Sequence, residues 1–129
     1  MTVMAASKQH KRGDRVGGRI QEELMGLLLR GEVADPAVNG ACISRVELSD
    51  DLRHARCYVR LLDPEPSEVE RKRVVRALQR AAGHIRRLLA PRLQVKYQPE
   101  LKFFWDEGAD TQARVEAVLE ELRREGDLS

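Results

Sequence analysis

Between His54 and Leu61, apolar and polar side chains alternate strictly, and this constrains the fold more than any other feature of the sequence. The apolar set is Ala55, Cys57, Val59 and Leu61, and the polar set is His54, Arg56, Tyr58 and Arg60. Successive side chains of a β-strand point to opposite faces of a sheet. The pattern therefore predicts a strand with one face in a core and one basic face, with a single aromatic ring, in water.

Two further segments have the composition of strands. Residues 41–48, ACISRVEL, are rich in β-formers, and Ser49-Asp50-Asp51-Leu52 has the chemistry of a turn, so that residues 41–61 are expected to form a hairpin. Residues 100–105, ELKFFW, predict a third strand. Its inward side chains are expected to be Leu101, Phe103 and Trp105, and its outward ones Lys102 and Phe104.

Helical spacing of apolar residues is found before and after these strands. The first such segment starts at Val16 and predicts a helix to about Gly31, before Asp35-Pro36. Its glycines, Gly17, Gly18 and Gly26, each cost about 1 kcal/mol relative to alanine. Packing must therefore hold this helix, and a close approach to a neighbouring backbone is one reason for glycine there.

The last segment, 111–125, has regular apolar positions and is expected to be capped by Asp110 or Thr111. These apolar positions are Val115, Val118, Leu119 and Leu122. From Asp106 to Asp127 eight acids stand against Arg114, Arg123 and Arg124. The segment suits a docking element, an electrostatic shield or a packing helix, and its regular spacing favours packing.

The middle of the chain predicts a long amphipathic helix. Ser67 and Glu70 fit a capping box that opens it. Its apolar stripe consists of Val74, Leu78, Ala81, Ile85 and Leu88. Gly83 lies in the middle of this segment and is a poor helix former, so a kink or a break into two helices is expected there.

Formal net charge is only +2, but the charges are unevenly distributed. From Glu70 to Lys96 there are nine basic residues and one acid, Glu70. On a helical wheel five side chains fall within about 80° of one another, away from the apolar stripe. This set, here named the cationic ridge, is Arg73, Arg76, Arg80, His84 and Arg87.

The cationic ridge has almost no acidic neighbours at the i±4 positions, which favours phosphate binding over an ordinary solvated helix face. Arg86, Arg92 and Lys96 add to the same basic segment. Aromatic residues make up only 4% of the chain, whereas proteins that bind extended single strands stack several bases on exposed rings. Recognition of folded RNA through its shape and phosphates fits better.

The sequence gives little support for an enzyme, a metal or cofactor protein, or a membrane or secreted protein. The two cysteines, Cys42 and Cys57, form no CxxC pair and are expected to be buried, reduced thiols. His10, His54 and His84 are scattered, and no nucleotide-binding, metalloprotease or paired-carboxylate motif is present, so we expect neither an enzyme nor a cofactor or metal. The longest apolar stretch, 24–29, is far shorter than the ~20 residues that cross a bilayer, and the N-terminus lacks a secretory signal. A cytoplasmic location is expected.

Four segments, taken in order, resemble the bacterial ribosome-binding factor A family. They are Asp35-Pro36, RVELSDDLRHARCYVRLL at 45–62, ALQRAAGHIRRLLAPRL at 77–93 and PELKFFWDEG at 99–108. The combination covers about residues 12–108 and is specific, although each piece alone is weak. In that family an Ala-x-Gly kink replaces the GxxG of ordinary KH domains, and Ala81-Ala82-Gly83 occupies this position here.

The resemblance implies an α+β, type II KH-like fold: a three-stranded sheet covered on one face by helices, in the order α-β-β-α-kink-α-β, plus a C-terminal helix. The element order agrees with the one predicted from periodicity. We expect a flexible basic N-terminus at 1–11, a KH-like RNA-binding domain at 12–108, and an acidic C-terminal helix and tail at 109–129.

The resemblance further implies a non-enzymatic ribosome biogenesis factor, associated with growth in the cold, that binds the immature small (30S) subunit and its 16S rRNA and promotes late maturation and rRNA processing. It is expected to be a monomer when free in solution. The expected RNA contacts are Arg73, Arg76, Arg80, Ala81, Ala82, Gly83, His84, Arg86, Arg87, Arg92 and Lys96. The alternative is a basic KH-like protein-interaction module with an acidic protein partner.

Overall fold

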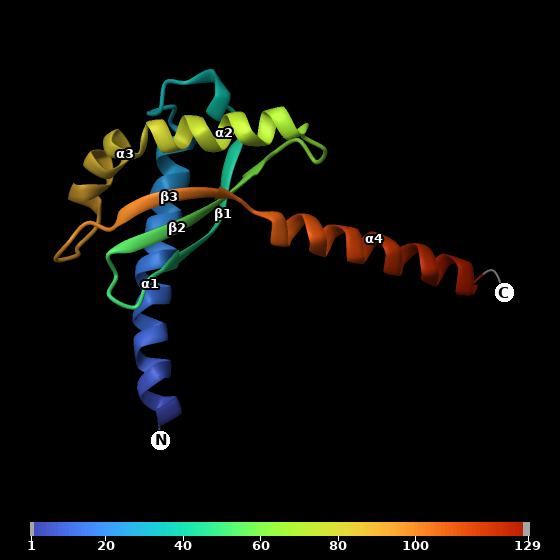
Figure 1. Ribbon diagram of the computed structural model, residues 1–129, viewed down its shortest axis with the longest axis horizontal. Helices are drawn as coiled ribbons and strands as arrows, with labels where there is room; N and C mark the ends of the chain where they lie inside the picture. Colours follow the sequence, from blue (N-terminus) through green and yellow to red (C-terminus); the bar gives the residue numbers. More distant parts are fainter. Residues whose placement is uncertain (1, 128–129) are drawn as a thin grey trace.

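The structure is a computed structural model that describes residues 2–127. Its main elements are α1 (Thr2–Leu29), β1 (Ala41–Leu48), β2 (His54–Leu61), α2 (Glu68–Arg80), α3 (Ala82–Leu89), β3 (Glu100–Trp105) and α4 (Glu107–Asp127). Short 3-10 helices span Pro36–Val38 and Ala90–Arg92. The predicted order of elements, with a long helix that breaks in two, is confirmed (Figure 1).

The three strands form one sheet in the order β1-β2-β3. β1 and β2 form the predicted antiparallel hairpin, and β3 lies parallel to β2 on its other side. The pairing of β1 with β2 is interrupted by a bulge between Ile43 and Arg45. The sheet is therefore mixed, and β2 is its central strand.

Only one face of the sheet is covered. On that face Ala55, Cys57 and Val59 of β2 are 0–1% exposed, as the alternation predicts. Helices α1, α2 and α3 supply the other side of the core, with Ile20, Leu24, Leu27, Val74, Leu78, Ile85 and Leu89 as its largest helical side chains. The opposite face, which carries Arg56 and Phe104, is open to solvent.

Helix α1 begins at Thr2, much earlier than the apolar pattern suggests, because that pattern starts only where the helix reaches the sheet at Val16. At Gly17 the helix backbone comes close to the sheet: a Cβ there would lie 2.7 Å from the carbonyl oxygen of Val46 in β1. The expectation of a close backbone approach is thus confirmed for Gly17. The predicted division of the chain after residues 11 and 108 stays a prediction.

The C-terminal helix differs from expectation. It begins at Glu107, not after Asp110, and it projects away from the sheet (Figure 1). Its apolar residues Val115, Val118, Leu119 and Leu122 are 46–56% exposed. The prediction that this helix packs on the domain is wrong, because Asp106 and Asp110 at its start bond to the strands and direct the helix away from the sheet. Over residues 2–127, none of the helices is both long and apolar enough to cross a membrane.

The two cysteines lie in different environments. Cys57 is fully buried on the core face of β2, and burial raises the pKa of its thiol to about 12. Cys42 alternates with the buried Ala41 and Ile43 in β1 and is half-buried, so the expectation of burial holds for Cys57 alone.

We expect the stability of the protein to depend on pH through Cys57. In the unfolded chain the thiol ionises near its ordinary pKa of 9.0, whereas the folded protein keeps it neutral to about 12. The buried neutral thiol stabilises the folded protein fully below pH 9. This stabilisation is lost as the pH rises from 9 towards 12, because the thiol of the unfolded chain ionises first. Denaturant unfolding of the parent and of Cys57→Ala should give free energies of unfolding that converge above pH 9. A constant difference between them would contradict the burial.

Candidate nucleic-acid interface

The cationic ridge rests on two helices that are built locally. The predicted capping box opens α2: the Ser67 hydroxyl accepts a hydrogen bond from the Glu70 amide at 3.1 Å, and the Glu70 carboxylate accepts one from the Ser67 amide. Val74 and Leu78 of α2 and Ile85 of α3 are fully buried. These buried side chains hold one side of both helices against the core, and the ridge therefore lies on the side that faces solvent.

The break between α2 and α3 lies at Ala81, whose backbone has φ −85° and ψ 0°. Gly83 follows the break inside α3, and its φ is not positive. A Cβ at Gly83 would meet nothing within 4 Å. The kink is confirmed, but it needs no backbone angle that only glycine adopts.

All five ridge side chains are exposed to solvent. The Arg80 guanidinium lies 3.4 Å from the Asp35 carboxylate, before the first 3-10 helix. Within residues 2–127, the other four ridge residues form no ion pair, in contrast to Lys72, which pairs with Glu68 at 3.1 Å. These four are Arg73, Arg76, His84 and Arg87. The ridge is therefore a surface whose positive charge is largely uncompensated.

The remaining basic residues of the predicted site lie apart from the ridge. Arg86 is half-buried and donates a hydrogen bond to the Gln98 carbonyl at 2.9 Å, which ties α3 to the segment before β3. Arg92 lies 3.6 Å from Glu23 of α1, and the Lys96 ammonium lies 5.5 Å from the centre of the Tyr97 ring. Arg86 and Arg92 thus have structural contacts of their own.

A groove runs along the edge of the sheet beside the ridge and was not predicted. It has a volume of about 480 Å³ and separates Arg71, Lys72 and Arg76 of α2 from the 103–105 segment of β3. It arises because β3 is an edge strand and α2 packs along it. Sequence periodicity contains no signal for this groove, since it follows from the order of the strands.

The open face of the sheet carries an aromatic pair. The parallel register places Tyr58 beside Phe104, with ring centres 6.0 Å apart, and the Arg45 guanidinium lies 4.0 Å from the centre of the Tyr58 ring. Strand alternation predicted both rings on the outer face. Their adjacency depends on the parallel pairing of β2 with β3, which alternation alone does not specify.

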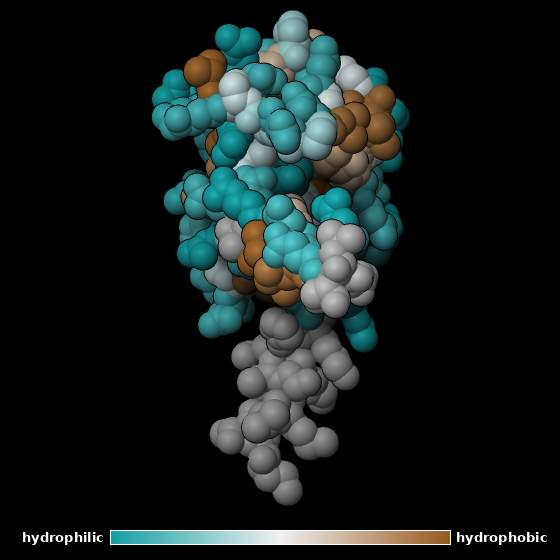
Figure 2. Space-filling view, turned by 90° about the vertical axis from the view of Figure 1, so that its right-hand side faces the viewer, coloured by the Kyte–Doolittle hydropathy of each residue, from teal (hydrophilic) through white to brown (hydrophobic). Residues whose placement is uncertain are grey.

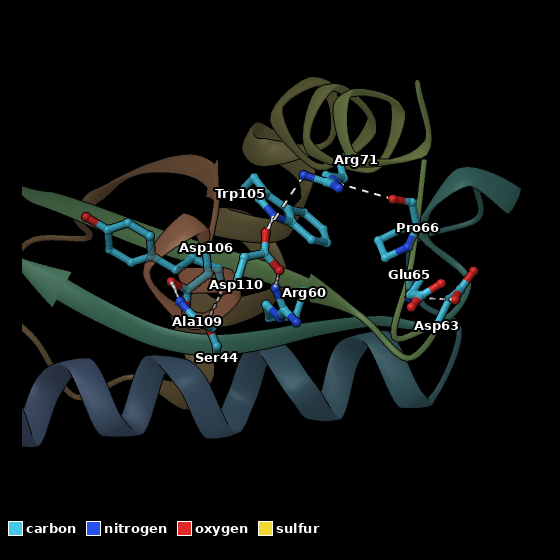
Figure 3. A network of polar contacts seen from close by, with 11 residues as sticks. Ser44, Arg60, Asp63, Glu65, Pro66, Arg71, Trp105, Asp106, Ala109 and Asp110 are labelled. Carbon is cyan, nitrogen blue, oxygen red and sulfur yellow. Dashed lines mark hydrogen bonds and ion pairs between the residues drawn. The ribbon is translucent and has the colours of Figure 1, made fainter. Parts of the chain in front are cut away.

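Two carboxylates fix the start of α4 (Figure 3). Asp106, which is 5% exposed, accepts hydrogen bonds from the Ser44 hydroxyl at 2.6 Å and from the Ala109 amide at 3.1 Å. Asp110 accepts hydrogen bonds from Arg60 and from the Trp105 indole. Burial raises the pKa of Asp110, but the bonds from Trp105 and Arg60 outweigh burial and hold this pKa below its ordinary value.

We expect Gly83→Ala to raise the free energy of unfolding by up to about 1 kcal/mol, because alanine is the better helix former and its methyl group meets open space. Thermal unfolding measures this directly. A less stable variant would contradict the geometry of α3. If the more stable protein loses affinity for RNA, then RNA approaches the bare backbone at residue 83.

A three-stranded sheet with helices on one face, in this connectivity, defines a small α+β domain of the type II KH-like class. The family model described as "Ribosome-binding factor A" matches residues 12–119. The chain belongs to the ribosome-binding factor A family.

Known members of the family are similar over nearly the whole chain. Ribosome-binding factor A of Sorangium cellulosum is 36% identical over 113 residues, covering 88% of this chain and 90% of the relative. That of Desulfatibacillum aliphaticivorans is 40% identical over 111 residues, covering 86% and 87%. The crystal structure of ribosome-binding factor A from Thermus thermophilus superimposes with a TM-score of 0.60 at 24% identity, covering 71% of this chain and 93% of that one, and shows the same fold.

Proposed function

We propose that this ribosome-binding factor is a non-enzymatic assembly factor that binds the immature small (30S) subunit through its 16S rRNA. Its cationic ridge contacts rRNA phosphates, and bound in this way it promotes late maturation and rRNA processing. The protein acts as a monomer and uses no cofactor.

The observation that carries the proposal is the unpaired charge of the ridge. Arg73, Arg76 and Arg87 are exposed and have no acidic partner within the part of the chain that the structure describes. Phosphate groups that approach them replace water and counterions, and no existing ion pair has to break. Family membership adds that the ligand belongs to the ribosome.

The RNA contacts come from a rigid support. The ridge side chains project from helices whose inner faces are buried in the core, and only the side chains themselves lose freedom on binding. The groove between α2 and β3 lies directly beside Arg76 and gives an RNA backbone room to follow the helix. Arg86 and Arg92 have structural contacts as well, to the Gln98 carbonyl and to Glu23, and we propose that they add further phosphate contacts beside the ridge.

The salt dependence of binding tests this proposal. For six phosphate contacts to folded RNA, from the four ridge arginines together with Arg86 and Arg92, a plot of log affinity against log salt should have a slope of about −4, at ~0.7 per contact. Affinity should be measured for protein-free 16S rRNA and for free small subunits, between low and moderate salt.

A poly-acidic protein serves as the control ligand in the same buffers. Tighter retention on that protein than on 16S rRNA would favour the alternative, a KH-like protein-interaction module with an acidic partner. A slope near zero with rRNA would contradict phosphate recognition altogether.

A further inference from the structure

Helix α4 presents an apolar stripe to solvent. Its members, Val115, Val118, Leu119 and Leu122, are all about half exposed and recur at helical spacing, so that they lie on one side of the helix. Brown hydrophobic residues are visible at the surface among hydrophilic ones in the view from the side toward which α4 projects (Figure 2). A contiguous exposed apolar patch of this kind marks an interaction site.

The first turn of α4 is bonded to the domain, so the helix projects from the domain in a fixed direction. Asp106 connects its first turn to Ser44 of β1, and Asp110 connects it to Arg60 of β2 and Trp105 of β3 (Figure 3). Arg71 of α2 also lies 3.9 Å from the Asp110 carboxylate. All three strands and α2 therefore set the direction of α4, and a partner meets a helix that is already formed and oriented.

The charge of α4 identifies the partner. Residues 107–127 carry seven acids and three arginines. At 100° per residue, Glu116 and Arg123 lie on one flank of the stripe, and Arg114, Glu121 and Glu125 lie on the other. With seven acids against three arginines, the helix as a whole repels rRNA phosphates, and it repels a second copy of itself if two copies pair through this face. The same acidic excess attracts a surface with a basic rim.

We propose that α4 docks its apolar stripe into an apolar groove with a basic rim on a protein of the small ribosomal subunit. This inference rests on the proposed function. The domain then makes two contacts of opposite charge: the cationic ridge binds rRNA, and α4 binds protein. An amphipathic helix laid into a groove is a common mode of protein recognition.

The test compares two ligands, purified small ribosomal subunits and protein-free 16S rRNA. The full-length double variant Leu119→Gln, Leu122→Gln keeps helix propensity and removes the apolar character of the stripe. We expect its affinity for subunits to fall about tenfold, with its affinity for 16S rRNA unchanged. The matched control, Ala117→Gln with Arg124→Gln, alters the opposite side of α4 and should bind subunits like the parent.

Each other outcome overturns a stated part of the argument. If the double variant binds subunits like the parent, the docking inference is wrong and the proposed function stands. Equal losses for both ligands would place α4 on RNA, and a parent dimer that the double variant abolishes would make a second copy the occupant. Either result overturns the inference. If the parent binds neither ligand, the proposed function fails and the inference fails with it.

Discussion

Replacing Arg73, Arg76 and Arg87 together with glutamine is expected to lower the affinity for protein-free 16S rRNA roughly a hundredfold at constant salt. These three ridge side chains are exposed and carry no ion pair within residues 2–127. The slope of log affinity against log salt should become less steep by about 2, at ~0.7 for each lost contact. Filter binding or fluorescence anisotropy at several salt concentrations measures both quantities.

A matched control separates the ridge from net charge. Replacing the three exposed arginines of α4 with glutamine changes the total charge by the same amount on another surface. These are Arg114, Arg123 and Arg124. The control should keep the affinity of the parent for rRNA within a few fold. Equal losses in the two triple variants would show that overall charge, and not the ridge, determines binding.

Gly17→Ala is expected to lower the free energy of unfolding by about 1 to 3 kcal/mol. The added methyl carbon would lie 2.7 Å from the Val46 carbonyl oxygen, which is closer than real Cβ contacts. Val46 cannot move away easily, since its strand is paired with β2 through Cys57. Helix α1 would have to shift away from the sheet. Denaturant unfolding measures the change.

The adjacent glycine is the control. A Cβ at Gly18 meets nothing within 4 Å, so Gly18→Ala should raise the free energy of unfolding by up to about 1 kcal/mol through better helix propensity. The two neighbouring substitutions are thus expected to act in opposite directions. If both stabilise the protein, the contact between α1 and β1 is looser than described.

Local patterns were sufficient to predict most of the fold. Alternation predicted the hairpin and which side of β2 is buried, and Ser67 with Glu70 predicted the start of α2. Both features depend on residues close in sequence, whose geometry is set by the period of a strand or by one turn of a helix. The close approach at Gly17 was also predicted from local sequence. Glycine weakens a helix, so its presence inside one indicates a site where a larger side chain does not fit.

Features that depend on distant residues were missed. The bulge after Ile43, the anchoring of Asp110 by Arg60 and the groove beside Arg76 all follow from how β1, β2, β3 and α2 assemble. The position of α4 was predicted wrongly for a related reason. An apolar stripe indicates that a helix will be covered, but not whether its own core or another molecule covers it. Which of the predicted residues contact RNA remains a prediction.

The parallel pairing of β3 with the central strand also governs the order of folding. The β1–β2 hairpin closes over a turn of a few residues, whereas β3 pairs with β2 only after residues 62–99 have been synthesised and folded back. Contacts between residues far apart in sequence form slowly, because a long loop must first lose entropy. On a translating ribosome the sheet is therefore completed only after β3 has emerged, and the two helices that carry the ridge gain their final orientation when β3 joins the sheet.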